Sequence, residues 1–92
     1  MTVTVFHFWS PTCNPCKVIK PALEDIKEEF EGQIEWISIN TKEDPKAIAP
    51  RLNISVVPSF VVLKDGVEIG RYSGTQVGIV YAIIRKALAA TA

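Results

Sequence analysis

The chain has 92 residues, of which 48% are hydrophobic, and its ten basic and ten acidic residues give a net charge of zero. This composition predicts one globular domain over residues 1–92 and argues against disorder. Without a basic run, the chain has no electrostatic footprint for nucleic acid or for an anionic membrane surface. No apolar run is long enough to span a membrane, and residues 1–5 lack the features of a secretory signal, so we expect a cytoplasmic protein.

The first third of the chain predicts a strand followed by a long helix. Residues 2–9 are rich in β-branched and aromatic residues and are apolar on both faces, apart from threonines and His7, which indicates a central strand. Residues 13–31 carry apolar side chains at intervals of three and four, the pattern of an amphipathic helix. We expect Pro21 to kink this helix and Gly32 to end it.

The middle of the chain predicts a second strand and a second helix. Residues 33–40 have the composition of a strand. Residues 41–52 predict a short helix, for which Asp44 and Pro45 suit the start and Pro50 disrupts the end.

The last third of the chain predicts a hairpin and a closing helix. Two strands, residues 59–63 and 67–73, are joined by an Asp-Gly turn at 65–66, which tolerates the positive φ of a hairpin turn. Residues 75–90 have the apolar pattern of a helix. The order is therefore β-α-β-α-β-β-α, with a parallel first pair of strands and an antiparallel hairpin. We predict an α/β fold with a four-stranded mixed sheet and helices on both faces.

The two cysteines, Cys13 and Cys16, lie at the predicted junction between the first strand and the first helix. Two intervening residues at a helix start put both sulfurs within bonding distance. The free N–H groups and dipole of a first helical turn stabilise an anion, and such a position lowers the pKa of a thiol. Cys13 is therefore predicted to be the nucleophile that attacks disulfides, and Cys16 to resolve the mixed disulfide. Pro15 preorganises the first turn.

Two other interpretations of the cysteine pair are weaker. A zinc site needs four ligands, and the only favoured donors are Cys13, Cys16 and His7, which do not have a ligand spacing. Two inert structural cysteines are disfavoured because the pair opens a helix in a βαβ context. We therefore predict neither a metal nor a cofactor.

Residues 8–17, with the sequence FWSPTCNPCK, resemble the active-site stretch of the thioredoxin family. Pro21 lies where that family kinks its first long helix, and residues 64–66 match its hairpin. Val57–Pro58 matches a proline that members hold in the cis form opposite the redox pair. The similarity extends over nearly the whole chain and implies a thioredoxin fold. The residues that it implies for substrate binding are Trp9, Pro15, Val57, Pro58 and Gly74.

The sequence also departs from the family pattern. The usual first strand and helix are absent, which leaves the four-stranded core shared with glutaredoxins. We therefore expect the outer edge of the strand at 33–40 to be open and to allow edge-to-edge dimers at high concentration, although we expect a monomer otherwise. Thr12 and Asn14 stand where a tryptophan and a glycine are usual. Short members of this kind occur in some phages and archaea, so a viral origin is one possibility.

His7 stands where the family carries a buried acid, and Trp36 where a neighbouring lysine is expected. A single histidine in an apolar strand is usually a core residue that is satisfied by one hydrogen bond. His7 shares its face of the strand with Trp9, however, and histidine titrates near neutral pH. It is therefore also a candidate catalytic residue that accepts the proton of Cys16, and both interpretations stay open.

Three functions follow from the resemblance. The first is a thiol–disulfide oxidoreductase that reduces protein disulfides and receives electrons from a thioredoxin reductase or an equivalent donor. The second is glutaredoxin-like chemistry with glutathione, or oxidase or isomerase activity. The third is a redox-independent docking subunit for a partner such as a polymerase.

Overall fold

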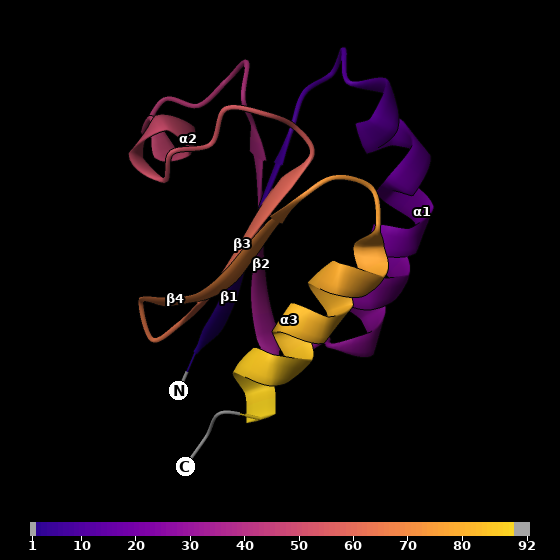
Figure 1. Ribbon diagram of the computed structural model, residues 1–92, viewed down its shortest axis with the longest axis vertical. Helices are drawn as coiled ribbons and strands as arrows, with labels where there is room; N and C mark the ends of the chain where they lie inside the picture. Colours follow the sequence, from indigo (N-terminus) through magenta and orange to yellow (C-terminus); the bar gives the residue numbers. More distant parts are fainter. Residues whose placement is uncertain (1, 90–92) are drawn as a thin grey trace.

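The computed structural model of the protein describes residues 2–89 and contains seven helices and strands in that part of the chain (Figure 1). They follow the predicted order β-α-β-α-β-β-α. The elements are β1 (Val3–Trp9), α1 (Asn14–Glu29), β2 (Ile34–Asn40), α2 (Ile48–Arg51), β3 (Ser59–Lys64), β4 (Val67–Ser73) and α3 (Val77–Ala89). The predicted end of the last helix, at residue 90, lies outside the described residues.

The four strands form one mixed sheet in the order β2-β1-β3-β4. β1 is central: it pairs with β2 in parallel and with β3 antiparallel, so that Val5 lies between Trp36 and Val62. β3 and β4 form the antiparallel hairpin. Within residues 2–89 no strand pairs with the outer side of β2, which confirms the prediction of an open edge at this strand.

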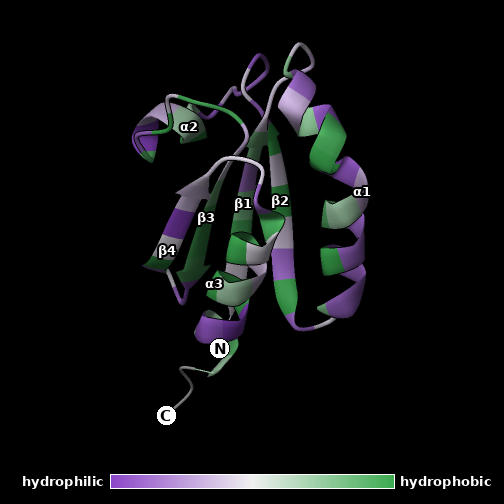
Figure 2. Ribbon diagram, turned by 45° about the vertical axis from the view of Figure 1, so that its right-hand side comes forward, coloured by the Kyte–Doolittle hydropathy of each residue, from purple (hydrophilic) through white to green (hydrophobic). Residues whose placement is uncertain are grey.

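Helices cover both faces of the sheet, as predicted. α1 and α3 lie side by side on one face, and α2 lies on the other (Figure 1). The middle of β3 is coloured as hydrophobic, and the first four residues of this strand are buried between the layers (Figure 2). On the α1/α3 face the buried residues are Val3, Val5, Ile19, Leu23, Ile26, Phe30, Phe60, Val62, Val80, Ile84 and Ala87. On the α2 face they are Phe8, Ala49 and Val61.

The second helix is much shorter than the predicted range of 41–52, so that prediction was wrong in its extent. The carboxylate of Asp44 accepts hydrogen bonds from the backbone N–H groups of Ile48 and Ala49, at 2.9 and 2.8 Å. Ala47 has a left-handed backbone with φ 52°, which interrupts any helix before it. Pro50 lies inside the helix, among the first positions where no N–H donor is needed, and does not end it.

Among residues 2–89, no helix combines the length and the apolar character needed to cross a membrane.

Candidate active site

Cys13 and Cys16 form a disulfide at the start of α1, with their Cα atoms 5.3 Å apart. Cys13 is the N-cap residue and has an extended backbone, and its Sγ accepts the backbone N–H of Cys16 at 3.2 Å. Pro15 occupies the first turn, where its missing N–H costs nothing. Cys16 is buried at 7% exposure, whereas Cys13 is more open to solvent. The pair thus presents one accessible sulfur, which sits where a helix end stabilises negative charge.

The turn before Cys13 is fixed by hydrogen bonds that sequence reasoning did not identify. Ser10 is buried, and its Oγ accepts the backbone N–H of Thr12 at 3.2 Å and lies 3.0 Å from the Thr12 Oγ1. The Ser10 carbonyl accepts the N–H of Cys13 at 3.1 Å. The Ser-Pro pair at 10–11 is a sequence signal for such a turn. These bonds hold Cys13 at the helix start.

Sheet register brings together residues that are far apart in the sequence. The end of β1 pairs with Ser59 at the start of β3, and Ser59 in turn pairs with Ser73 at the end of β4. Trp9, Pro58 and Gly74 lie next to these positions, so they meet at the end of the sheet from which the chain enters α1. Three of the predicted substrate-binding residues are therefore neighbours of the disulfide turn.

The peptide bond between Val57 and Pro58 is cis, as the resemblance implied. The Pro58 carbonyl accepts the N–H of Gly74 at 3.1 Å, which ties this segment to the end of β4. The Ser59 hydroxyl donates to the carbonyl of Val56 at 2.6 Å. Val56 itself is 56% exposed, so the segment presents apolar surface to solvent next to the site.

Gly74 has a structural reason to be glycine, separate from any contact with substrate. Its φ is +140°, and a Cβ atom there would lie 2.6 Å from the hydroxyl oxygen of Tyr72. That hydroxyl accepts the backbone N–H of Gln76 at 3.0 Å and so helps to fix the approach to α3.

His7 lies on the α1/α3 face of β1, half-buried between two aromatic rings. Its ring is stacked on Phe60 with centroids 4.9 Å apart, and it lies 5.9 Å from the ring of Trp36. Burial and the nearby positive charge of Lys27 lower the pKa of His7 to about 4, so the ring is neutral near neutral pH. Its Nε2 atom is buried and has no hydrogen-bond partner among residues 2–89. Packing against Phe60, and not a hydrogen bond within residues 2–89, holds this ring in place.

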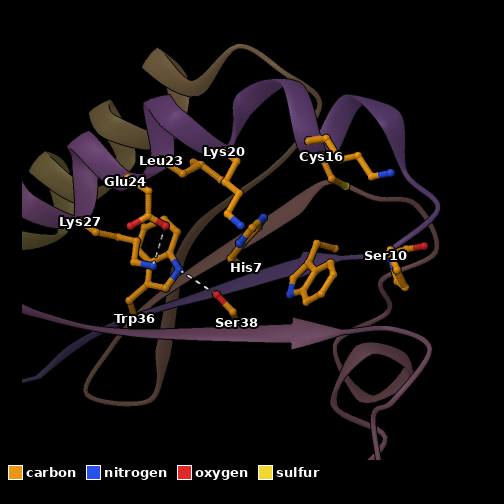
Figure 3. A pocket seen from close by; sticks show the side chains of 12 residues that line it. His7, Ser10, Cys16, Lys20, Leu23, Glu24, Lys27, Trp36 and Ser38 are labelled. Carbon is orange, nitrogen blue, oxygen red and sulfur yellow. Dashed lines mark hydrogen bonds and ion pairs between the residues drawn. The ribbon is translucent and has the colours of Figure 1, made fainter.

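A cavity of about 500 Å³ opens between α1 and the β2 edge, and Cys16 and His7 both line it (Figure 3). Lys20 extends from α1 toward His7 (Figure 3). The Trp36 indole N–H donates to the Ser38 hydroxyl at 3.2 Å. The remaining lining residues are Trp9, Ser10, Pro11, Lys17, Leu23, Glu24 and Lys27. The cavity connects the surroundings of the buried cysteine with those of the buried histidine.

Within residues 2–89, no three His, Cys, Asp or Glu side chains are grouped so that they could hold a metal ion.

Several solved structures have the same fold. The Schistosoma mansoni thioredoxin pre-protein superposes with a TM-score of 0.83 at 26% identity, over 92% of this chain and 78% of that one. Thioredoxin from Trypanosoma brucei brucei superposes with a TM-score of 0.87 over 96% of this chain and 76% of that one, and at 23% identity this shows the fold alone.

Sequence relatives agree with the structural comparison. Thioredoxin 1 of Nostoc sp. is 31% identical over 67 residues, which cover 73% of this chain and 62% of that protein, so the chain spans less than two thirds of this relative. Staphylococcus aureus thioredoxin is 31% identical over 74 residues, which cover 80% of this chain and 70% of the relative. The sequence profile of the family described as Thioredoxin matches residues 1–85, and the chain therefore belongs to the thioredoxin family.

Proposed function

We propose that the protein is a thiol–disulfide oxidoreductase that reduces disulfides in other proteins through Cys13 and Cys16. The observation that carries this proposal is the disulfide at the start of α1, which has one accessible sulfur and one buried sulfur. A nucleophile must reach its substrate, whereas a resolving thiol acts only within the protein.

The reaction begins with the reduced dithiol. The Cys13 thiolate attacks one sulfur of the substrate disulfide and forms a mixed disulfide, while the other substrate sulfur leaves as a thiolate. Cys16 then loses its proton and attacks the Cys13 sulfur, which releases the second substrate thiol and leaves the Cys13–Cys16 disulfide. Two electrons pass to the substrate, and a thioredoxin reductase or an equivalent donor returns them. The structure corresponds to the oxidised form of this cycle.

We also propose that His7 assists the deprotonation of Cys16, since both residues line the same cavity. The reference pKa of a thiol is about 8.5. Burial and the charge of Lys27 lower the pKa of His7 to about 4. Full proton transfer between such groups costs about 6 kcal/mol. Attraction between the developing imidazolium and thiolate charges would offset part of this cost. His7 therefore acts as an acceptor only while the Cys16 charge develops beside it.

The substrate-binding surface in this proposal consists of the residues that meet around the disulfide turn. Trp9 ends β1, the loop before β3 carries Val57 and the buried Pro58, and Pro15 is exposed on α1. The Val57 backbone is the proposed pairing edge for an extended substrate segment. Gly74 belongs to this surface through its bond to Pro58.

We further propose that residues 1–92 form one domain and act as a cytoplasmic monomer.

Trapping of the intermediate tests the two cysteine roles. With Cys16→Ser, a mixed disulfide should accumulate through Cys13, because no thiol remains to resolve it. The matched variant Cys13→Ser should give little adduct. Mass spectrometry of a tryptic digest identifies the cysteine that carries the substrate. An adduct on Cys16 in place of Cys13 would show that the assigned roles are reversed.

An insulin-reduction assay separates the electron donors and the alternative functions. Turnover with NADPH and thioredoxin reductase, together with much slower turnover with glutathione and glutathione reductase, supports the proposal. The reverse preference favours glutaredoxin-like chemistry. The reduction potential of the Cys13–Cys16 couple distinguishes a reductant from an oxidase, since thioredoxins lie near about −270 mV and strong oxidants near about −120 mV. A biological activity that survives replacement of both cysteines by serine would point to docking alone.

A further inference from the structure

The cavity between α1 and β2 has a composition that disulfide exchange does not require. Its volume of about 500 Å³ falls within the range of small-molecule sites. Much of its wall is apolar and aromatic, with contributions from Trp9, Trp36, Leu23 and Pro11. Flat indole surfaces offer stacking contacts to a planar ligand. Because β2 is an edge strand, the cavity opens at the side of the sheet.

The charged residues around this cavity are mainly basic. Three lysines and one glutamate line it, a net charge of +2. Lys27 forms an ion pair with Glu24 at 3.3 Å and lies 5.7 Å from the centre of the Trp36 ring. Lys17 and Lys20 have no carboxylate partner among residues 2–89. Two cations that face an apolar cavity without a counter-ion indicate an anionic ligand.

His7 lines the same cavity as the two lysines. Its buried Nε2 has no hydrogen-bond partner among the described residues, and an unmade bond of this kind is costly. Lys20 reaches from α1 toward the same ring (Figure 3). Because Nε2 is buried, a ligand in the cavity would contact Lys20 and not this nitrogen.

We propose that this cavity binds a small aromatic carboxylate, with the ring against Trp36 and Leu23 and the carboxylate near Lys17 and Lys20. This inference goes beyond the proposed function, since it requires neither electron transfer nor a substrate protein. The site lies behind Cys16, on the side of α1 that faces the β2 edge.

The test uses 2-naphthoate as the probe and its neutral analogue 2-naphthamide as the control, with the oxidised protein and no electron donor. Titrations are followed by ¹H–¹⁵N NMR. We expect 2-naphthoate to shift the indole N–H signals of Trp36 and Trp9, with a dissociation constant of about 1 mM or lower, as is usual for a ligand of this size. The amide should bind at least about fivefold more weakly, and added salt should weaken only the naphthoate.

Matched variants locate the anion. Lys17→Met with Lys20→Met removes two charges and keeps the apolar stems, and we expect it to weaken naphthoate binding about three- to tenfold. The control, Lys46→Met with Lys86→Met, removes two exposed charges away from the cavity and should leave binding unchanged. The dispersion of the NMR signals confirms that each variant is folded.

Three results would overturn the proposal: equal affinity for the two probes, equal affinity of the two double variants, or shifts confined to the Val56–Pro58 segment. Because the redox assays are separate measurements, failure here leaves the proposed function intact, and failure of the redox assays leaves this binding result intact.

Discussion

α1 and α3 together contribute 29 residues of helix to one face of the sheet, 16 from α1 and 13 from α3, whereas α2 contributes four residues to the other face. Within residues 2–89 the first face has eleven buried core residues and the second has three. The helix that carries the cysteines belongs to the heavily packed face. The comparison indicates that apolar packing holds the redox helix rigidly, whereas the α2 region depends more on individual hydrogen bonds.

The largest expected difference between the two faces comes from a matched pair of phenylalanines. Phe60 and Phe8 are both fully buried, Phe60 toward α1 and α3 and Phe8 toward α2. We expect Phe60→Ala to lower the free energy of unfolding by about 4–5 kcal/mol, and Phe8→Ala by about 3 kcal/mol. The loss is smaller for Phe8 because the thin α2 layer collapses more easily into the space that the removed ring leaves. Urea denaturation measures both. If the alanine variants do not fold, Phe60→Leu and Phe8→Leu should show the same order, and equal losses would break the comparison.

The next effect concerns His7, a half-buried titratable side chain on the heavily packed face. Its pKa is lowered to about 4, so between pH 6.5 and 4 the unfolded chain binds a proton that the folded chain does not. The contribution of His7 to the free energy of unfolding is therefore fully present above pH 6.5 and is lost as the pH falls toward 4. The loss is up to about 3 kcal/mol, because the pKa is lowered from 6.5 to about 4.

The matched variant for this prediction is His7→Phe, which keeps a ring on Phe60 and removes the unpartnered nitrogen. Carboxylates titrate in both proteins, so the difference between the two curves of stability against pH isolates His7. We expect the variant to lose less stability between pH 7 and pH 4. Parallel curves, or an NMR titration of His7 near its ordinary value, would contradict the assigned pKa.

The smallest effect belongs to the α2 face and tests its dependence on hydrogen bonds. Asp44→Ala removes the acceptor of the Ile48 and Ala49 N–H groups, and we expect a loss of about 1–2 kcal/mol. Asp44→Asn keeps one side-chain oxygen and should lose less. Hydrogen exchange should become faster in residues 48–54 while α1 stays protected. A loss of protection in α1 would show that the two faces unfold together.

Most of the fold could be predicted from local sequence pattern, because the long elements have a strong period. The apolar residues of α1 recur at helical spacing and are the ones that the structure buries, namely Ile19, Leu23 and Ile26. The cysteine spacing likewise indicated a helix start, and Cys13 is the N-cap. The extent of α2 could not be predicted in this way. It is set by the left-handed backbone of Ala47 and by the carboxylate of Asp44, which accepts the first N–H groups of the helix although it lies three residues before Ala47.

The properties of the site depend on contacts between elements, which sequence pattern does not contain. His7 could be placed on the correct face of β1, but its pKa depends on burial against Phe60 of β3 and on the charge of Lys27 of α1. The cavity depends on the separation of α1 from an edge strand, and helical spacing alone does not show that three lysines of α1 line it. The Ser-Pro pair at 10–11 indicates a turn, but the hydrogen bonds that fix this turn depend on the positions of Thr12 and Cys13 in the folded chain.

The central position of β1 has a consequence for the synthesis of the protein on the ribosome. β1 emerges before the other three strands of its sheet, and one of its two neighbours, β3, begins at residue 59, fifty residues after β1 ends at residue 9. At a translation rate of roughly 5–20 residues per second, one edge of the nascent β1 strand stays unpaired for roughly 3–10 seconds before β3 is synthesised. During that interval Phe8, which is fully buried in the finished fold, lacks both β3 and α2. The nascent chain thus exposes the apolar strand β1 to chaperones and to neighbouring chains until β3 and α2 have left the exit tunnel.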